Sequence, residues 1–244
     1  MQASPLCQVV CFNTCMTAKI STSAAKSVVM LGASGAVGGA ALNTLLTMPG
    51  AKRLTLLLRR KLTNLGNTKV TQHVVDVFDA KAYQSYLAGH DAAICTFGVG
   101  ESSKVSKDEF IRIDKTAVVD FATACKAAGV SHFELLSAVA SDAKSASFYL
   151  RTKGELQDAL IALNFERLSL FQPSMILTPT NRYGALQALT LAVWPKLKPA
   201  LAGPLRKYRG IPVEQLSAAM AKNLFTVGNA TEYLHWDDFV ALTA

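Results

Sequence analysis

A glycine-rich turn between an apolar run and a helical stretch constrains the fold of this chain more than any other feature. It reads Gly32-Ala33-Ser34-Gly35-Ala36-Val37-Gly38-Gly39. Glycines at positions 32, 35 and 38 allow a sharp reversal, the approach of backbone amides to a pyrophosphate, and close packing of the helix on the strand. The free N–H groups at the N-terminus of the following helix favour the binding of an anion. We therefore predict a dinucleotide-binding loop, with a glycine turn without a ligand as the alternative. No Gly-Lys-Ser/Thr follows, which excludes a nucleoside triphosphatase phosphate loop.

Short β-rich runs alternate with helical stretches from residue 26 onward. The predicted strands span residues 26–31, 54–58, 70–75, 92–97, 132–136 and 166–171, and the predicted helices residues 37–46, 80–87, 107–128 and 148–163. This alternation is typical of βαβ units and a parallel sheet. The strand runs are apolar throughout, as expected when helices cover both faces. We predict the α/β class, with a Rossmann-type, doubly wound parallel sheet.

The chain is expected to form a leader and one domain. Residues 1–25 are predicted to be a disordered leader rather than a signal peptide, with Met16 as an alternative start. Residues 26–244 are predicted to form a single NAD(P)-binding domain, because half of the residues are hydrophobic and suffice for a core. From about residue 175 the βαβ rhythm stops, so residues 175–244 are expected to form a small cap on the carboxyl edge of the sheet. That cap includes a helix over residues 213–227.

The net charge of +8 originates in the first third of the chain. Residues 1–75 contain eight Lys and Arg and no Asp or Glu, whereas charges balance after residue 75. This distribution indicates one anion-binding region and argues against a nucleic-acid-binding protein. The expected partner is a small-molecule substrate of unknown identity, and the chain is expected to be a monomer or a homodimer.

Apolar segments do not predict a transmembrane helix, because no run of 18 apolar residues is free of charges and turn formers. Residues 185–194 are nearly all apolar and are followed by basic residues. Such a segment could lie on an anionic membrane or cover a hydrophobic substrate. A buried cap or a subunit contact is the preferred interpretation, so membrane contact is not expected.

The cysteines do not form a recognisable metal site. Cys7, Cys11 and Cys15 lie four residues apart without a histidine nearby, and the four histidines are dispersed along the chain. Cys95 and Cys125 lie in apolar segments and are predicted to be core residues. No metal is predicted. The odd number of cysteines without disulfide spacing predicts a reducing, cytoplasmic location.

The end of the second predicted strand discriminates between NAD(H) and NADP(H). NAD-binding loops have a carboxylate about 20 residues downstream, but here Arg59, Arg60 and Lys61 occupy that place. Guanidinium groups cannot accept a ribose hydroxyl, whereas they pair with a 2′-phosphate. We predict NADP(H) over NAD(H), with Arg60 and Lys61 in a solvated turn as the alternative. Asp76, the first carboxylate, could accept a hydrogen bond from the adenine amino group or cap a helix.

Three polar residues form a candidate reaction centre. Ser137 follows the fifth predicted strand, and Tyr149 and Lys153 lie on one face of a predicted helix. A nearby ammonium lowers the pKa of a phenol, so Tyr149 could exchange a proton with a carbonyl or alcohol oxygen while a hydride moves. Ser137 could hydrogen-bond the same oxygen, and Lys153 could hold the nicotinamide ribose. The alternative is a surface Tyr and Lys on an amphipathic helix.

Four stretches of the chain resemble the atypical branch of the short-chain dehydrogenase/reductase superfamily. They are GASGAVGG, RRK, IDKTAVVDFATACKAAGVSHFELLSA and YLRTKGELQDAL, and the resemblance covers roughly residues 26–230. The most similar group is the Tat-interacting-protein-like group, with bacterial NAD(P)H-binding homologues. Asp114 stands where related enzymes often have an Asn.

The resemblance implies a role for each matched residue. Cofactor phosphates would bind to Gly32, Ser34, Gly35, Val37, Arg59 and Arg60, Gly98 would line the dinucleotide path, Ser137, Tyr149 and Lys153 would be catalytic, and Pro173 and Ser174 would approach the nicotinamide. We expect an NADP(H)-dependent oxidoreductase that transfers a hydride to or from a carbonyl or alcohol, with Tyr149 as acid/base. The alternative is an NADPH-binding sensor that acts through protein partners without turnover. A nucleotide-sugar epimerase or dehydratase is less favoured, because the chain lacks a larger substrate domain.

Overall fold

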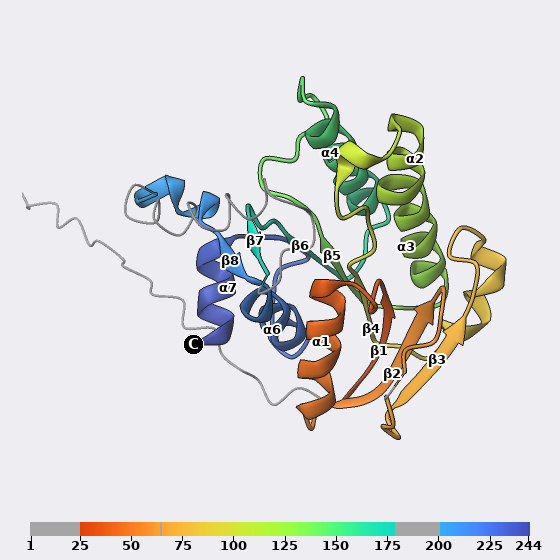
Figure 1. Ribbon diagram of the computed structural model, residues 1–244. Coiled ribbons are helices and arrows are strands. Elements are labelled where there is room, and N and C mark those ends of the chain that lie inside the picture. The colour runs from red at the N-terminus through yellow and green to blue at the C-terminus, as the bar shows by residue number, and fades with distance from the viewer. Residues whose placement is uncertain (1–24, 64, 179–200) are drawn as a thin grey trace, which may run out of the picture.

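The computed structural model describes residues 25–63, 65–178 and 201–244. The main sheet in these ranges has seven parallel strands in the order β3-β2-β1-β4-β5-β6-β9 (Figure 1). The strands are β1 Lys26–Leu31, β2 Ala51–Leu58, β3 Val70–Val74, β4 Ala92–Cys95, β5 His132–Leu136, β6 Arg167–Phe171 and β9 Thr231–Leu234. The chain runs from β1 to one edge and then returns to β4 and the other edge. This reversal confirms the predicted doubly wound Rossmann-type fold.

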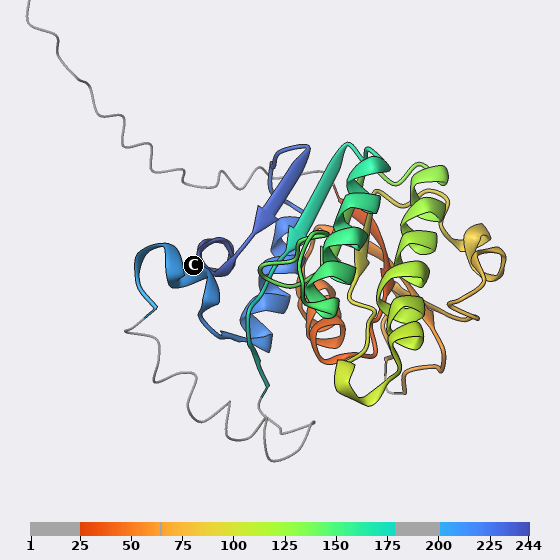
Figure 2. The ribbon, with the colours of Figure 1, turned by 90° about the horizontal axis from the view of Figure 1, so that it is seen from above.

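Helices cover both faces of the sheet (Figure 2). The α-helices are α1 Ala36–Thr47, α2 Lys107–Ile111, α3 Ala117–Ala127, α4 Phe148–Ala162, α6 Val213–Asn223 and α7 Trp236–Thr243. The other helices of the described residues are the 3-10 helices η1 Ala80–Ala82, η2 Gln84–Tyr86, η3 Ser102–Lys104 and η6 Gly203–Tyr208, and the π-helical η4 Arg112–Thr116. A separate parallel pair consists of β7 Ile176–Leu177 and β8 Ile211–Pro212. No helix within the described ranges is both long and apolar enough to span a bilayer.

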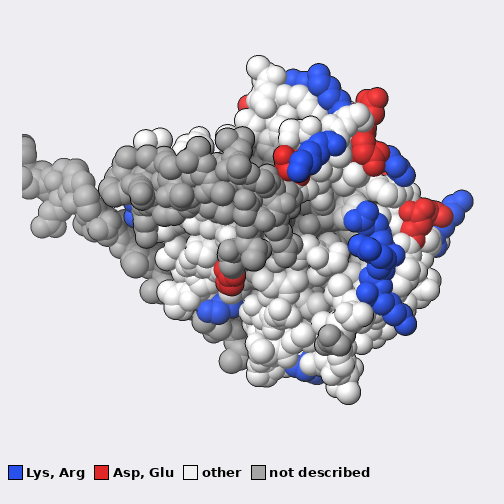
Figure 3. Space-filling model, in the orientation of Figure 1, with Lys and Arg blue, Asp and Glu red and all other residues white. Residues whose placement is uncertain are grey.

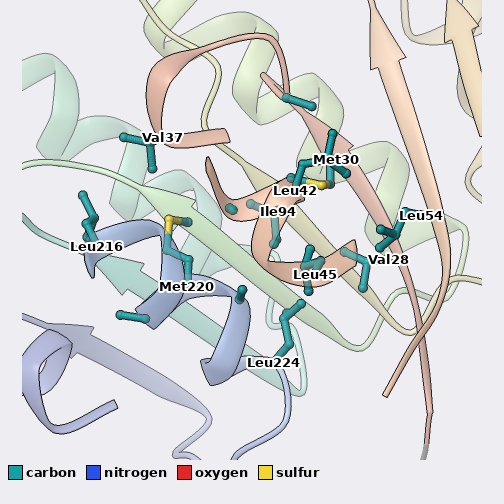
Figure 4. Packing of buried hydrophobic residues seen from close by; sticks show 14 of the residues in the cluster. Val28, Met30, Val37, Leu42, Leu45, Leu54, Ile94, Leu216, Met220 and Leu224 are labelled. Atoms are coloured by element: carbon teal, nitrogen blue, oxygen red, sulfur yellow. The ribbon is translucent and has the colours of Figure 1, made fainter. Parts of the chain in front are cut away.

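Each central strand contributes to two hydrophobic cores. Along β1, Val28 and Met30 pack toward α1 and α6, whereas Val29 and Leu31 pack toward α3 and α4. Figure 4 shows the first of these cores, where side chains of α1 and α6 meet those of β1 and β2. Alternate residues of a strand point to opposite faces, so strands covered on both sides must be apolar throughout. Cys95 and Cys125 are buried free thiols in the second core, as predicted.

Two predicted helices differ in the structure. The stretch over residues 80–87 forms two 3-10 helices, η1 and η2, rather than one α-helix. The stretch over residues 107–128 is divided by the π-helical η4. A π turn adds only one residue to one turn, and the apolar stripe on either side of it hides the interruption.

The residues after 175 form more of the sheet than the predicted cap allows. Strand β9 pairs in parallel with β6, and α6 packs against α1 in the first core. Sequence reasoning missed β9 because this half-exposed edge strand lacks the apolar run that marks the equally short β4, and it missed β8 because two residues give no periodic signal. The apolar stretch at 185–194 and the predicted leader, with Cys7, Cys11 and Cys15, lie outside the described residues.

A buried polar cluster joins β5, β6, β9 and α6. Arg167 pairs with Glu232 at 2.7 Å and donates to the Asn223 side chain at 2.8 Å. Asn223 in turn donates to Glu134 at 2.9 Å. Among the residues that the structure describes, neither the second oxygen of Glu134 nor Nδ1 of His132 has a hydrogen-bond partner. Burial therefore raises the pKa of Glu134 well above its ordinary value and lowers the pKa of His132 well below its own.

Replacing each of the two carboxylates of this cluster by an amide is expected to change the free energy of unfolding in opposite directions. The raised pKa of Glu134 means that its contribution to stability is present at acid pH and is lost as the pH rises above about 4.3, the ordinary pKa of Glu. Glu134→Gln is therefore expected to raise the free energy of unfolding at pH 8 by at least about 1 kcal/mol, and by less at pH 5.

Glu232→Gln is the matched control, because it removes the partner of the largely buried Arg167 guanidinium. It is expected to lower the free energy of unfolding by about 3 kcal/mol. Urea unfolding at both pH values measures the two effects. Destabilisation by Glu134→Gln at pH 8 would contradict the assignment of Glu134 as the uncompensated carboxyl.

Candidate functional site

A cleft of about 440 Å³ opens at the carboxyl ends of β1, β4, β5 and β6. This is the point where the strand order reverses, the usual ligand site of open α/β sheets. Its walls come from the turn before α1, the loop after β4, the end of β5, the first turns of α4 and the segment after β6. The lining residues are Gly35, Ala36, Val37, Thr96, Phe97, Gly98, Val99, Gly100, Glu101, Asp114, Leu136, Ser137, Tyr149, Lys153, Ser174, Met175, Ile176 and Thr178.

The glycine turn places the N-terminus of α1 on this cleft. The N-cap of α1 is Gly35, which has no side chain to cap the N–H groups of the first turn. The first turn itself contains no acidic residue. Gly32 has a positive φ of 96°, and a Cβ at Gly38 would collide with the Gly32 carbonyl and the Thr96 hydroxyl. Only glycine allows α1 to approach the loop after β4 this closely. The N–H groups of the first turn are thus available to an anionic ligand.

The structure divides the predicted phosphate-binding residues into two groups. Gly35, Ala36 and Val37 line the cleft, whereas Gly32, Ser34 and Gly38 do not. Gly32 accepts hydrogen bonds from the Gly35 amide at 2.9 Å and the Thr96 hydroxyl at 3.2 Å. Gly32 and Gly38 therefore shape the turn, and the following residues face the ligand.

Ser137 is fixed in the cleft by a relay of two buried glutamines. The side-chain amide of Gln157 donates to Ser137 Oγ at 2.6 Å, and Gln172 donates to Gln157 Oε1 at 3.0 Å. Because Ser137 Oγ accepts this bond, its hydroxyl proton is left for an acceptor in the cleft. The glutamines were not found by sequence reasoning, since their contacts join α4 to the loop after β6.

Tyr149 and Lys153 line the same cleft from adjacent turns of α4. Tyr149 is 37% exposed, and its ring lies 5.6 Å from that of Phe110. Lys153 is buried, and its Nζ lies 2.7 Å from Oδ1 of Asp114. Burial favours a lower pKa for Lys153, but the attraction of Asp114 and Tyr149 outweighs it and raises the pKa above 10.5. Lys153 is therefore a cation at neutral pH.

Arg59 and Arg60 follow β2, and both are exposed. Neither makes an ion pair within the described part of the chain, and neither lines the cleft. Figure 3 shows Lys and Arg side chains gathered on this face toward β2 and β3. The two guanidinium groups are accordingly free to meet an anion beside the carboxyl end of β2.

The remaining predicted residues have mixed placements. Gly98 and Ser174 line the cleft, whereas Pro173 does not, and its carbonyl accepts a hydrogen bond from Val139 N at 3.0 Å. Asp76 is exposed and accepts from the Phe78 amide at 2.9 Å, and the helix cap considered for it is provided by Asp79 on η1.

Several lining residues were missed by sequence reasoning. They are Thr96, Phe97, Val99, Gly100, Glu101, Leu136, Met175, Ile176 and Thr178. All of them lie at or beyond the carboxyl end of a predicted strand, which is the one signal that could have found them.

Comparisons with known proteins identify the family. Residues 32–166 match the family described as NAD(P)H-binding. The chain is 34% identical over 206 residues to Protein HTATIP2 of Rattus norvegicus, which covers 84% of this chain and 83% of that protein. It is 27% identical over 177 residues to Protein FMP52, mitochondrial, of Candida albicans, with 70% and 77% coverage.

Solved structures share the fold at low sequence identity. MoeE5 in complex with UDP-glucuronic acid and NAD superposes with a TM-score of 0.67 at 15% identity, covering 85% of this chain and 75% of that one. The oxidoreductase ylbE of Lactococcus lactis superposes with a TM-score of 0.64 at 18% identity, covering 89% and 95%.

The relatives correct one prediction and confirm another. The FMP52 proteins of Candida albicans, Meyerozyma guilliermondii and Scheffersomyces stipitis are named mitochondrial, so the predicted cytoplasmic location is wrong. Cysteine spacing reflects the redox state of a compartment and does not separate one reducing compartment from another. The resemblance predicted from the motifs is confirmed, since the family match spans more than half of the chain and HTATIP2 matches most of its length. The chain belongs to the NAD(P)H-binding family.

Proposed function

We propose that the protein is an NADP(H)-dependent oxidoreductase that transfers a hydride to or from a carbonyl or alcohol substrate. One observation carries the proposal. Ser137, Tyr149 and Lys153 line a single cleft together with the N-terminus of α1. The N-terminus of α1, which suits an anionic cofactor, and Tyr149, which can transfer a proton, thus line the same cleft. Hydride transfer with protonation of the substrate oxygen requires both in one place.

The residues of the cleft fit a nicotinamide dinucleotide. The free N–H groups of α1 suit a pyrophosphate, and Gly35, which lines the cleft, has no Cβ of its own there. Gly98 lines the same cleft. A bound nicotinamide supplies or accepts the hydride. Ser137 donates a hydrogen bond to the substrate oxygen and keeps its proton, and Tyr149 gives a proton to that oxygen or removes one. Lys153, a cation on the same face of α4 as Tyr149, would hold the hydroxyls of the nicotinamide ribose.

The preference for NADP(H) rests on the end of β2. Arg59 and Arg60 are exposed there without an ion pair in the described residues, and the chain has no Asp or Glu before Asp76. A 2′-phosphate would receive charge-assisted hydrogen bonds from these groups, whereas a ribose hydroxyl would find no acceptor.

Tyr149→Phe tests the acid/base assignment. The variant keeps the ring that packs on Phe110 but lacks the hydroxyl, so kcat for NADPH consumption is expected to fall by about 10²- to 10⁴-fold while the Kd for NADPH stays unchanged. A panel of aldehydes and ketones measures turnover. Tyr233→Phe, at an exposed tyrosine of β9, is the control.

Two outcomes of that panel would count against the proposal. Turnover that is unaffected by Tyr149→Phe would contradict the role of Tyr149. Tight NADPH binding by the unmodified protein without turnover of any substrate would instead favour a dinucleotide-binding sensor that acts through protein partners.

Arg59→Ala tests the cofactor preference. Loss of a charge-assisted hydrogen bond costs about 1.5–3 kcal/mol, so the affinity for NADPH relative to NADH is expected to fall by about 10- to 100-fold. Titration of the protein with each dinucleotide measures the ratio. Lys52→Ala, which removes an exposed cation at the other end of β2, should leave the ratio unchanged. An unchanged ratio in Arg59→Ala would overturn the 2′-phosphate assignment.

A further inference from the structure

The π-helical turn η4 brings a carboxylate under the cleft. Asp114 lies in the middle of η4, between α2 and α3, and is 2% exposed. A π turn rotates the residues it contains relative to a continuous α-helix, and such turns occur frequently at functional sites. Asp114 is the one acidic residue of this turn, and it lines the cleft beside Lys153.

Asp114 joins two walls of the cleft through its two oxygens. Oδ1 lies 2.7 Å from Nζ of Lys153 on α4, and Oδ2 accepts a hydrogen bond of 2.7 Å from the backbone amide of Val99. A Cβ at Gly98 would lie 2.8 Å from Oδ1, so the glycine makes room for the carboxylate. One side chain thus determines where the ammonium and the loop after β4 lie.

An amide in this place could not satisfy both partners. The Lys153 ammonium and the Val99 N–H are both donors. A carboxylate offers two acceptor oxygens, whereas an Asn has one oxygen and one NH₂ group, which would face one of the donors. An Asn in place of Asp114 would therefore change the hydrogen bonding of the cleft, and not only its charge.

We propose that Asp114 is a positioning residue of the oxidoreductase, and that it acts through Lys153 and the backbone of Val99. This inference rests on the proposed function. The carboxylate fixes the position of the ammonium and keeps it charged, because the attraction of Asp114 raises the pKa of Lys153. Without this carboxylate, Lys153 would lose its proton at a lower pH. A charged Lys153 in a fixed position would hold the nicotinamide ribose while Tyr149 exchanges a proton with the substrate oxygen.

The other ionisable groups around this pair do not replace Asp114. The Cys95 thiol at the end of β4 is buried, and desolvation raises its pKa to about 12, so it is neutral. Glu101 in the loop after β4 pairs with Lys104 at 2.8 Å. Lys115 of η4 pairs with Glu155 of α4 at 2.6 Å. Asp114 is therefore the carboxylate that compensates Lys153.

Asp114→Asn in the full-length protein tests the proposal. We expect kcat for carbonyl reduction at pH 7 to fall at least tenfold, and the alkaline decline of kcat to begin at a lower pH than in the wild type. Asp120→Asn, at an exposed residue of α3, removes the same charge outside the cleft and should leave both values unchanged. Unchanged kcat and pH profile in Asp114→Asn would overturn the proposal.

A second measurement separates this inference from the proposed function, because it needs no turnover. Urea unfolding midpoints and NADPH dissociation constants are measured for Asp114→Asn, Lys153→Met and the double variant. We expect each single variant to unfold at lower urea than the wild type, and the double variant to recover part of the loss. NADPH binding should weaken about tenfold in Asp114→Asn. This measurement remains decisive even if the wild type binds NADPH but turns over no substrate. Asp114 would be rejected as a positioning residue if the effects of the two single variants on stability simply add in the double variant and Asp114→Asn leaves NADPH binding unchanged.

Discussion

The close contact between the first turn of α1 and the loop after β4 is the constraint on which the site depends. Gly38 lies against the Gly32 carbonyl and the Thr96 hydroxyl without a side chain of its own. The hydrogen bond from Thr96 to Gly32 ties the two loops at the point where the strand order reverses. Both loops then form walls of one cleft, and the N–H groups of α1 point at whatever enters it. A larger residue at position 38 would separate these walls.

The sequence predicted the architecture wherever a signal was local. Apolar runs and the glycine turn predicted six strands of the sheet, and the spacing of Tyr149 and Lys153 predicted one helix face. Strand β9 was missed because this half-exposed edge strand lacks the apolar run that marked the equally short β4. The interruption by η4 was missed because the apolar stripe continues on both sides of it. Contacts between distant elements were also missed, such as the Gln157 relay to Ser137 and the pair of Asp114 with Lys153. No spacing rule connects residues that only the folded sheet brings together.

The two ends of the sheet use buried polar groups in different ways. At the amino ends of β5 and β6, Arg167, Asn223 and Glu232 satisfy one another and join β9 and α6 to the domain. At the carboxyl ends, Ser137 and the first turn of α1 retain donors without a partner in the described fold. Buried donors are costly unless they are satisfied. The mutually satisfied groups at the amino ends therefore stabilise the domain, whereas the donors at the carboxyl ends remain available to a ligand.

In the proposed complex, the arrangement of charge would also orient the dinucleotide. Its negative charge lies on its phosphates, and among the described residues the groups free to meet them include the N-terminus of α1 and the guanidiniums after β2. Lys153 would add a second strong positive centre at the reaction end if it stood alone, and a phosphate could then compete for that end. The carboxylate of Asp114, 2.7 Å away, cancels most of this attraction at a distance, because an ion pair has a much shorter range than a single charge. Because Asp114 neutralises the buried Lys153, the phosphates would be attracted mainly to the N-terminus of α1 and the guanidiniums after β2. The part of the cleft around Lys153 would then select its ligand by hydrogen bonds.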